Sequence, residues 1–93
     1  MTKKLDIIEV AEKALAVIES LLNKKAEGII SVTKEGEEWK VLAEMLERKA
    51  VPDTQDILSI YELKLSGNLE LTEYKRIGLR RRDDLRVEEE ELK

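Results

Sequence analysis

The sequence predicts an α+β fold: an N-terminal amphipathic helix packed on a four-stranded antiparallel β-meander. Apolar residues recur at spacings of three and four in the first part of the chain and alternate with a period of two after it. Turn-forming residues divide this second part into four strand-length segments. Because 93 residues support one modest core, the helix must lie across one face of the sheet.

The helix is expected over about residues 4–26. From Leu5 to Leu22 the apolar residues share one side of a helix, and charged residues fill the opposite side. Gly28 is expected to end it, because glycine readily takes the left-handed conformation that follows a last helical turn. The strands are expected at about residues 28–34, 38–49, 57–65 and 69–80.

The first hairpin is expected to turn at Glu35 and Gly36. Such a two-residue loop places large apolar side chains opposite one another, in the pairs Val32–Trp39 and Ile30–Val41. The connection to the third strand contains the only proline of the chain, followed by an aspartate, which predicts a turn at Pro52-Asp53.

The last hairpin allows two loop lengths. A two-residue loop would pair Leu65 with Glu70, whereas a three-residue loop from Gly67 to Leu69 pairs it with Leu71. The period of the apolar pattern favours the longer loop. Residues 1–82 are then expected to form a single domain. Residues 83–93 are expected to be a charged tail, disordered or solvated, because they carry too little apolar content to pack.

Composition excludes several kinds of site. The chain has no cysteine, so it can form neither a disulfide nor a thiolate nucleophile. It also has no histidine, the commonest general base and the commonest metal ligand in proteins. Its carboxylates fall mostly on outward positions, where a solvated surface is a better interpretation than a catalytic pair. We therefore expect a protein that is not an enzyme and uses no cofactor or metal.

The charge pattern also bears on location. The net charge is −4, and the chain opens with Met1-Thr2-Lys3-Lys4 and continues with charges every few residues. This opening is typical of neither a signal peptide nor a membrane span, so we expect a cytoplasmic protein without a membrane partner.

A basic cluster beside Tyr74 has three possible interpretations. It contains Lys75, Arg76, Arg80, Arg81 and Arg82. Basic residues and aromatics on a sheet can bind single-stranded nucleic acid, but the chain is acidic overall and acidic residues follow at once, so no nucleic-acid partner is expected. The remaining interpretations are a solvated strand end and a contact for an acidic protein partner.

The sheet face away from the helix is expected to be half apolar. In the assumed registers it carries Ile29, Leu42, Leu46, Leu58 and Ile60, with charged residues between them. An uncovered antiparallel face normally alternates to polar residues, so this pattern indicates a contact surface for a partner or a homodimer. The alternative is that a bulge or a register error moves several of these residues into the core.

A series of short motifs runs through the strands and their connections. The most specific runs from Pro52-Asp53-Thr54 through Asp56 to Tyr61-Glu62. Others are Gly28-Ile29-Ile30-Ser31-Val32, Glu38-Trp39-Lys40-Val41 and Tyr74-Lys75-Arg76. On these motifs the chain from Gly28 to Arg82, about 55 residues, resembles the gas vesicle protein O family.

The resemblance implies an accessory protein of gas vesicle formation, the formation of proteinaceous, gas-filled buoyancy organelles. It implies contacts with other gas vesicle proteins and no established catalytic activity. The chain departs from the family pattern at Leu69, where the family usually has a glycine before its Glu-Leu pair. It also lacks the closing tyrosine after the basic run that ends at Arg82.

The expected contact surface combines the second sheet face with the basic strand end: Leu42, Ile60, Tyr74, Arg76, Arg80, Arg81 and Arg82. The alternative function is a small regulatory or inhibitory protein-binding module unrelated to gas vesicles, because a helix followed by a meander sheet also serves such roles.

Overall fold

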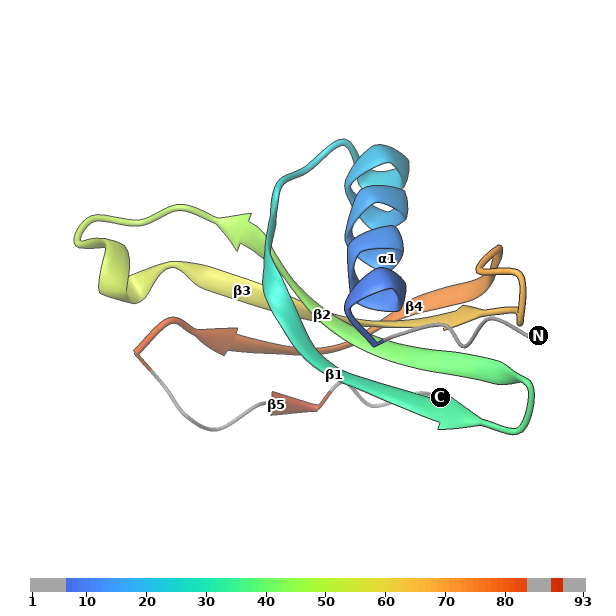
Figure 1. Ribbon diagram of the computed structural model, residues 1–93. Helices are drawn as coiled ribbons and strands as arrows, with labels where there is room; N and C mark the ends of the chain where they lie inside the picture. The colour runs from blue at the N-terminus through green and yellow to red at the C-terminus, as the bar shows by residue number, and fades with distance from the viewer. Residues whose placement is uncertain (1–6, 84–87, 90–93) are drawn as a thin grey trace.

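The computed structural model describes residues 7–83, 88 and 89. Its elements are α1 (Ile7–Leu22), β1 (Ala26–Glu35), β2 (Glu38–Arg48), the short 3₁₀ helix η1 (Asp53–Gln55), β3 (Ile57–Leu65), β4 (Leu71–Arg81) and β5 (Glu88–Glu89). The strands form one antiparallel sheet in the order β1-β2-β3-β4-β5, and α1 lies over one face (Figure 1). This confirms the predicted α+β meander. No helix in the described part of the chain has the length and apolar content to cross a membrane.

The core lies between α1 and the sheet. Val10, Ala14 and Ile18 are spaced by four residues, so they form one stripe along α1, and all three are fully buried. They belong to one cluster with side chains buried on β2 and β3: Trp39, Val41, Ala43, Met45, Leu63 and Leu65. The alternation along β2, which buries every second residue, matches the strand period that predicted it.

The helix ends earlier than predicted. Its last residue is Leu22, and Asn23 takes the left-handed conformation, with φ of 55°. Asparagine tolerates this conformation after a last helical turn, so Gly28 is not needed and lies within β1 instead. The Glu19 carboxylate then accepts a 2.8 Å hydrogen bond from the backbone N–H of Ala26, which joins the helix to the first residue of β1. The predicted start of the helix, before residue 7, lies outside the described residues.

The predicted turn of the first hairpin is one residue too early. The loop is Gly36-Glu37, and Gly36 has φ of +63°, as the first loop position of a type II′ turn requires. The observed pairs are Val32–Val41 and Lys34–Trp39.

A β-bulge at Ile30 then changes which residues of β1 face the core. Ile29, expected on the outer face, lies opposite Ala43 and packs against the core, whereas Ile30 is 48% exposed. The shifted turn and the bulge together explain why Ile29 faces the core and Ile30 faces solvent.

The predicted three-residue loop of the last hairpin is confirmed. Leu65 lies opposite Leu71, and the backbone N–H of Ser66 donates to the carbonyl of Glu70 at 2.8 Å. Leu69 closes the loop with φ of +63°, the left-handed residue that such loops contain.

The structure adds a short strand that the sequence did not predict. Glu88 and Glu89 of β5 pair with Leu79 and Gly78 of β4. The other residues of the predicted tail beyond Asp83 lie outside the described residues.

Candidate functional site

The most specific sequence motif begins in the connection between β2 and β3 and continues into β3. We call residues 49–56, which connect β2 to β3, the braced loop. In Figure 1 this loop lies at the left end of the sheet. It contains a cis peptide bond between Val51 and Pro52 and the single turn η1. Two backbone hydrogen bonds of 3.0 Å hold this turn, from the N–H of Gln55 to the carbonyl of Pro52 and from the N–H of Asp56 to the carbonyl of Asp53.

Asp56 fastens the base of the braced loop. The residue is 2% exposed, and its Oδ1 accepts a 2.8 Å hydrogen bond from the backbone N–H of Ala50. Its Oδ2 accepts from Nη2 and Nε of Arg82, at 3.1 and 3.3 Å. Both carboxylate oxygens are therefore engaged, which a buried charge requires.

Arg82 links Asp56 of the braced loop to a residue of β1. Its Nη1 lies 2.9 Å from Oε1 of Glu27 in β1, so one guanidinium joins two carboxylates from separate parts of the chain. Backbone hydrogen bonds reinforce the joint, from the N–H of Arg82 to the carbonyl of Asp56 and from the N–H of Asp83 to the carbonyl of Thr54. We call Glu27, Asp56 and Arg82 the charge clamp.

The pKa values of Asp56 and Arg82 are both shifted by their hydrogen bonds. The hydrogen bond from the Ala50 N–H is the largest cause that lowers the pKa of the Asp56 carboxyl; burial opposes it, and Arg82 lowers it further. The hydrogen bond to Glu27, followed by that to Asp56, raises the pKa of Arg82. An ionised, fully hydrogen-bonded Asp56 is suited to a structural role and not to proton transfer at neutral pH.

The braced loop presents an apolar residue to solvent. Val51 is 99% exposed, and Pro52, Asp53 and Thr54 are exposed beside it. Single exposed apolar residues are ordinary on protein surfaces. Val51 differs because several hydrogen bonds and the charge clamp fix the loop that carries it, so little conformational entropy remains to be lost when a partner binds there.

The second sheet face differs from the expected open apolar surface. Leu58 and Ile60 lie on this face and are 1% and 2% exposed. Arg80 lies opposite Leu58 and Glu44 lies opposite Ile60, so the ion pair between Arg80 and Glu44 crosses β3 over these two side chains. Ile60 therefore offers no contact surface, and Leu42 is half-buried on the same face.

The structure separates the other predicted contact residues. Arg76 forms an ion pair of 3.6 Å with Glu47, on the helix side of the sheet. Tyr74 is 42% exposed and its ring centroid lies 6.4 Å from that of Tyr61. Arg81 is exposed at the end of β4, next to the braced loop.

Two further motif residues have evident structural places. Trp39 is 7% exposed in the core, with the Lys34 ammonium 4.9 Å from its ring centroid. Glu62 lies on β3 opposite Lys75 of β4.

Sequence reasoning did not identify the partners of the arginines. Their partners are glutamates two or three strands away in the sheet: Glu27 for Arg82, Glu44 for Arg80 and Glu47 for Arg76. A correct register with its bulges was the only signal that could have placed these glutamates beside the basic cluster.

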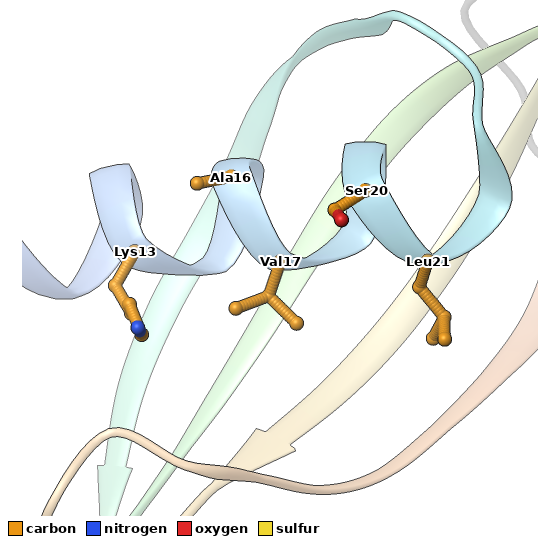
Figure 2. Close-up of a pocket in the computed structure, with 5 residues that line it drawn as sticks. All are labelled: Lys13, Ala16, Val17, Ser20 and Leu21. Atoms are coloured by element: carbon orange, nitrogen blue, oxygen red, sulfur yellow. The ribbon is translucent and has the colours of Figure 1, made fainter.

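Two hollows on the described surface lack the features of a substrate pocket. One of about 390 Å³ runs along α1, where Lys13, Val17 and Leu21 point to the same side of the helix (Figure 2). Its lining comes from a single helix, so groups from different elements do not converge there. A cleft of about 480 Å³ beside the braced loop is lined by charges of both signs, including the whole charge clamp. Among the residues that the structure describes, no acidic cluster has the arrangement of a metal site.

Comparison with known proteins agrees with the resemblance carried by the braced loop and the strands. The model of the family described as "Gas vesicle synthesis protein GvpO" matches residues 1–86. The chain belongs to the GvpO family. Neither this description nor the names of the relatives describe an enzyme.

Three GvpO relatives are similar over most of this chain. Gas vesicle protein O1 of Halobacterium salinarum is 38% identical over 82% of the chain and 64% of its own length. Gas vesicle protein O of Haloferax mediterranei is 38% identical over 82% of the chain, and that of a Streptomyces species is 33% identical over 75%, each over 55% of its own length. The chain thus spans a little over half of these longer proteins. No solved structure matches it.

Proposed function

We propose that the chain acts in gas vesicle formation as a non-enzymatic accessory protein that binds other gas vesicle proteins. Its place of action is the cytoplasm, at the forming vesicle. Membership of the GvpO family supports the link to gas vesicles. The site supports a binding role, because the carboxylates of the charge clamp, which line the cleft beside the braced loop, are engaged in hydrogen bonds and ion pairs that hold the fold.

The observation that carries the proposal is the fully exposed Val51 on the braced loop. Arg81 is exposed at the end of β4, and the next two residues of the chain donate backbone hydrogen bonds to the braced loop, so an apolar residue and a cation lie at one end of the molecule. An exposed apolar residue on a hydrogen-bonded loop, with a charge at the same end of the molecule, is the kind of anchor that protein interfaces use. Of the residues first expected to bind a partner, Arg81 stays in the proposed surface. Tyr74 is also exposed, but it lies opposite Leu63, toward the other end of β4 from the braced loop.

The test is a count of gas vesicles in cells that depend on this protein for them. Val51→Glu should leave the melting temperature unchanged, because the side chain is exposed, and should lower the number of vesicles per cell several-fold. Ile7→Glu is the matched control, since Ile7 is 59% exposed on α1, away from the braced loop. Capture of other gas vesicle proteins from the same cells should fall in parallel. If Val51→Glu and Arg81→Glu both support vesicles and capture as well as the parent, the proposed surface is wrong.

A further inference from the structure

The sheet has two open edges among the described residues: the outer edge of β1 has no strand partner, and the outer edge of β4 is only partly paired. β4 pairs with β3 from Leu71 to Arg81, and on its other edge β5 pairs with only two residues, Gly78 and Leu79. Elsewhere along this edge the described residues supply no further strand. An edge of this kind presents backbone donors and acceptors that an extended segment can use.

The sequence of β5 indicates what kind of segment this edge accepts. β5 consists of Glu88 and Glu89, within a run of four glutamates. The strand on which it lies carries four basic residues, of which Lys75 and Arg81 are exposed, and one acidic residue, Glu73. An acidic extended segment is thus matched to a basic strand, and this complementarity favours acidic occupants over neutral or basic ones.

The contact made by β5 is also short enough to exchange. Two paired residues give few backbone hydrogen bonds, and these are offset by the conformational entropy lost when an extended segment is ordered. A longer acidic segment could pair with more of the eleven residues of β4 and so compete with β5.

We propose that the β4 edge is a strand-addition site for an acidic, extended segment of a partner protein. β5 occupies this site within the chain, and the partner segment replaces it. The inference rests on the proposed function, for which it supplies a second point of contact and the chemistry of the segment that binds there.

The test measures binding of a fluorescein-labelled peptide with the sequence of residues 84–93 to the full chain by fluorescence anisotropy. In one variant of the chain Glu88 and Glu89 are both changed to proline, which cannot donate to a strand ladder and so vacates the edge. The peptide should bind this variant at least tenfold more tightly than it binds the parent. The same peptide with prolines at the two positions should not bind.

Two charge variants in the double-proline chain test the basic strand. Lys75→Glu combined with Arg81→Glu should weaken peptide binding at least fivefold. Lys13→Glu, on the outer side of α1, is the control and should leave binding unchanged. Far-UV circular dichroism and the melting temperature verify that each variant is folded.

Equal affinity for the parent and the double-proline chain, or no binding to either, would overturn the strand-addition site. So would an equal loss of binding in the Lys13 control. These measurements use no gas vesicle component, so such a result leaves the proposed function to be judged by the vesicle counts.

Discussion

The backbone conformation of Leu69 destabilises the fold, whereas the packing of its side chain stabilises it. Its φ of +63° lies in the left-handed region, which costs a residue with a Cβ roughly 1–2 kcal/mol. Its side chain is partly buried against the core, which offsets part of that cost. The family pattern usually has a glycine at this position. Leucine instead of glycine adds a packed side chain here but loses the backbone freedom that glycine has.

A pair of substitutions separates the two contributions. Leu69→Ala and Leu69→Gly both remove the packed side chain, but only glycine relieves the left-handed backbone. We expect Leu69→Gly to be more stable than Leu69→Ala by about 1 kcal/mol, measured as the free energy of unfolding in urea. Equal stability of the two variants would show that the backbone at this position carries no such cost.

At the scale of elements, α1 is attached to the sheet by one stripe of side chains. Ile18 is fully buried in that stripe. Ile18→Ala should therefore lower the free energy of unfolding by about 3 kcal/mol, from lost burial and the cavity left behind. Ile7→Ala, at a residue 59% exposed, should change it by less than about 1 kcal/mol. If chemical denaturation gave similar losses for both, the stripe would not be what holds the helix.

The turns of the two hairpins approach each other at Gly67. A Cβ added there would lie 3.1 Å from the carbonyl oxygen of Glu37, closer than side chains normally approach backbone. Gly67→Ala should destabilise the fold by roughly 1 kcal/mol, because one turn must move away from the other. Asn68→Ala, at the exposed neighbouring position, is the control, and thermal unfolding distinguishes the two. If Gly67→Ala had the same melting temperature as the control, the close approach of the two turns at Gly67 would be wrong.

The types and order of the helix and the first four strands could be predicted because each long element keeps its own apolar period. The last hairpin was also predictable, since only one loop length placed Leu65 opposite Leu71. The register of β1 was not, because the turn lies one residue later than predicted and a bulge at Ile30 then adds one residue and exchanges the faces of its neighbours. The helix end was missed because Asn23 performed the role assigned to glycine.

The candidate site was predictable only in part. The sequence singled out Asp56 and Arg82, as members of a loop motif and of a basic cluster, but did not relate them to each other. They lie 26 residues apart, and their pairing with Glu27 depends on the alignment of all the strands from β1 to β4. The second sheet face was misjudged for a similar reason, because the Arg80–Glu44 ion pair covers apolar residues that the pattern left open.

At the scale of the whole molecule, the charge clamp makes stability depend on pH. The folded-state pKa of Asp56 is lowered, whereas in the unfolded chain it is about 4. The stability contributed by its ionised form is therefore fully present above about pH 4 and is lost as the pH falls through the folded-state pKa.

Asp56→Asn isolates this contribution. The variant should melt several degrees below the parent near pH 7, because it loses the charge that Arg82 and the Ala50 N–H bind. The gap in Tm should narrow as the pH falls below about 4, where the parent carboxylate also becomes neutral. Thermal unfolding at a series of pH values from about 3 to 7 gives the comparison. A gap that stays constant over this range would mean that Asp56 acts through shape and not through charge.

The meander order has a consequence for how the chain acquires its structure. Each strand from β1 to β4 pairs with the strand next to it in sequence, so the first hairpin can form while later strands are still being synthesised. The charge clamp cannot, because it needs Glu27 from the first strand and Arg82 from beyond the last long one. During synthesis the braced loop is therefore locked only after β4 has been made, and a ribosome-bound chain that ends before Arg82 should present Val51 on a loop that is not yet fixed.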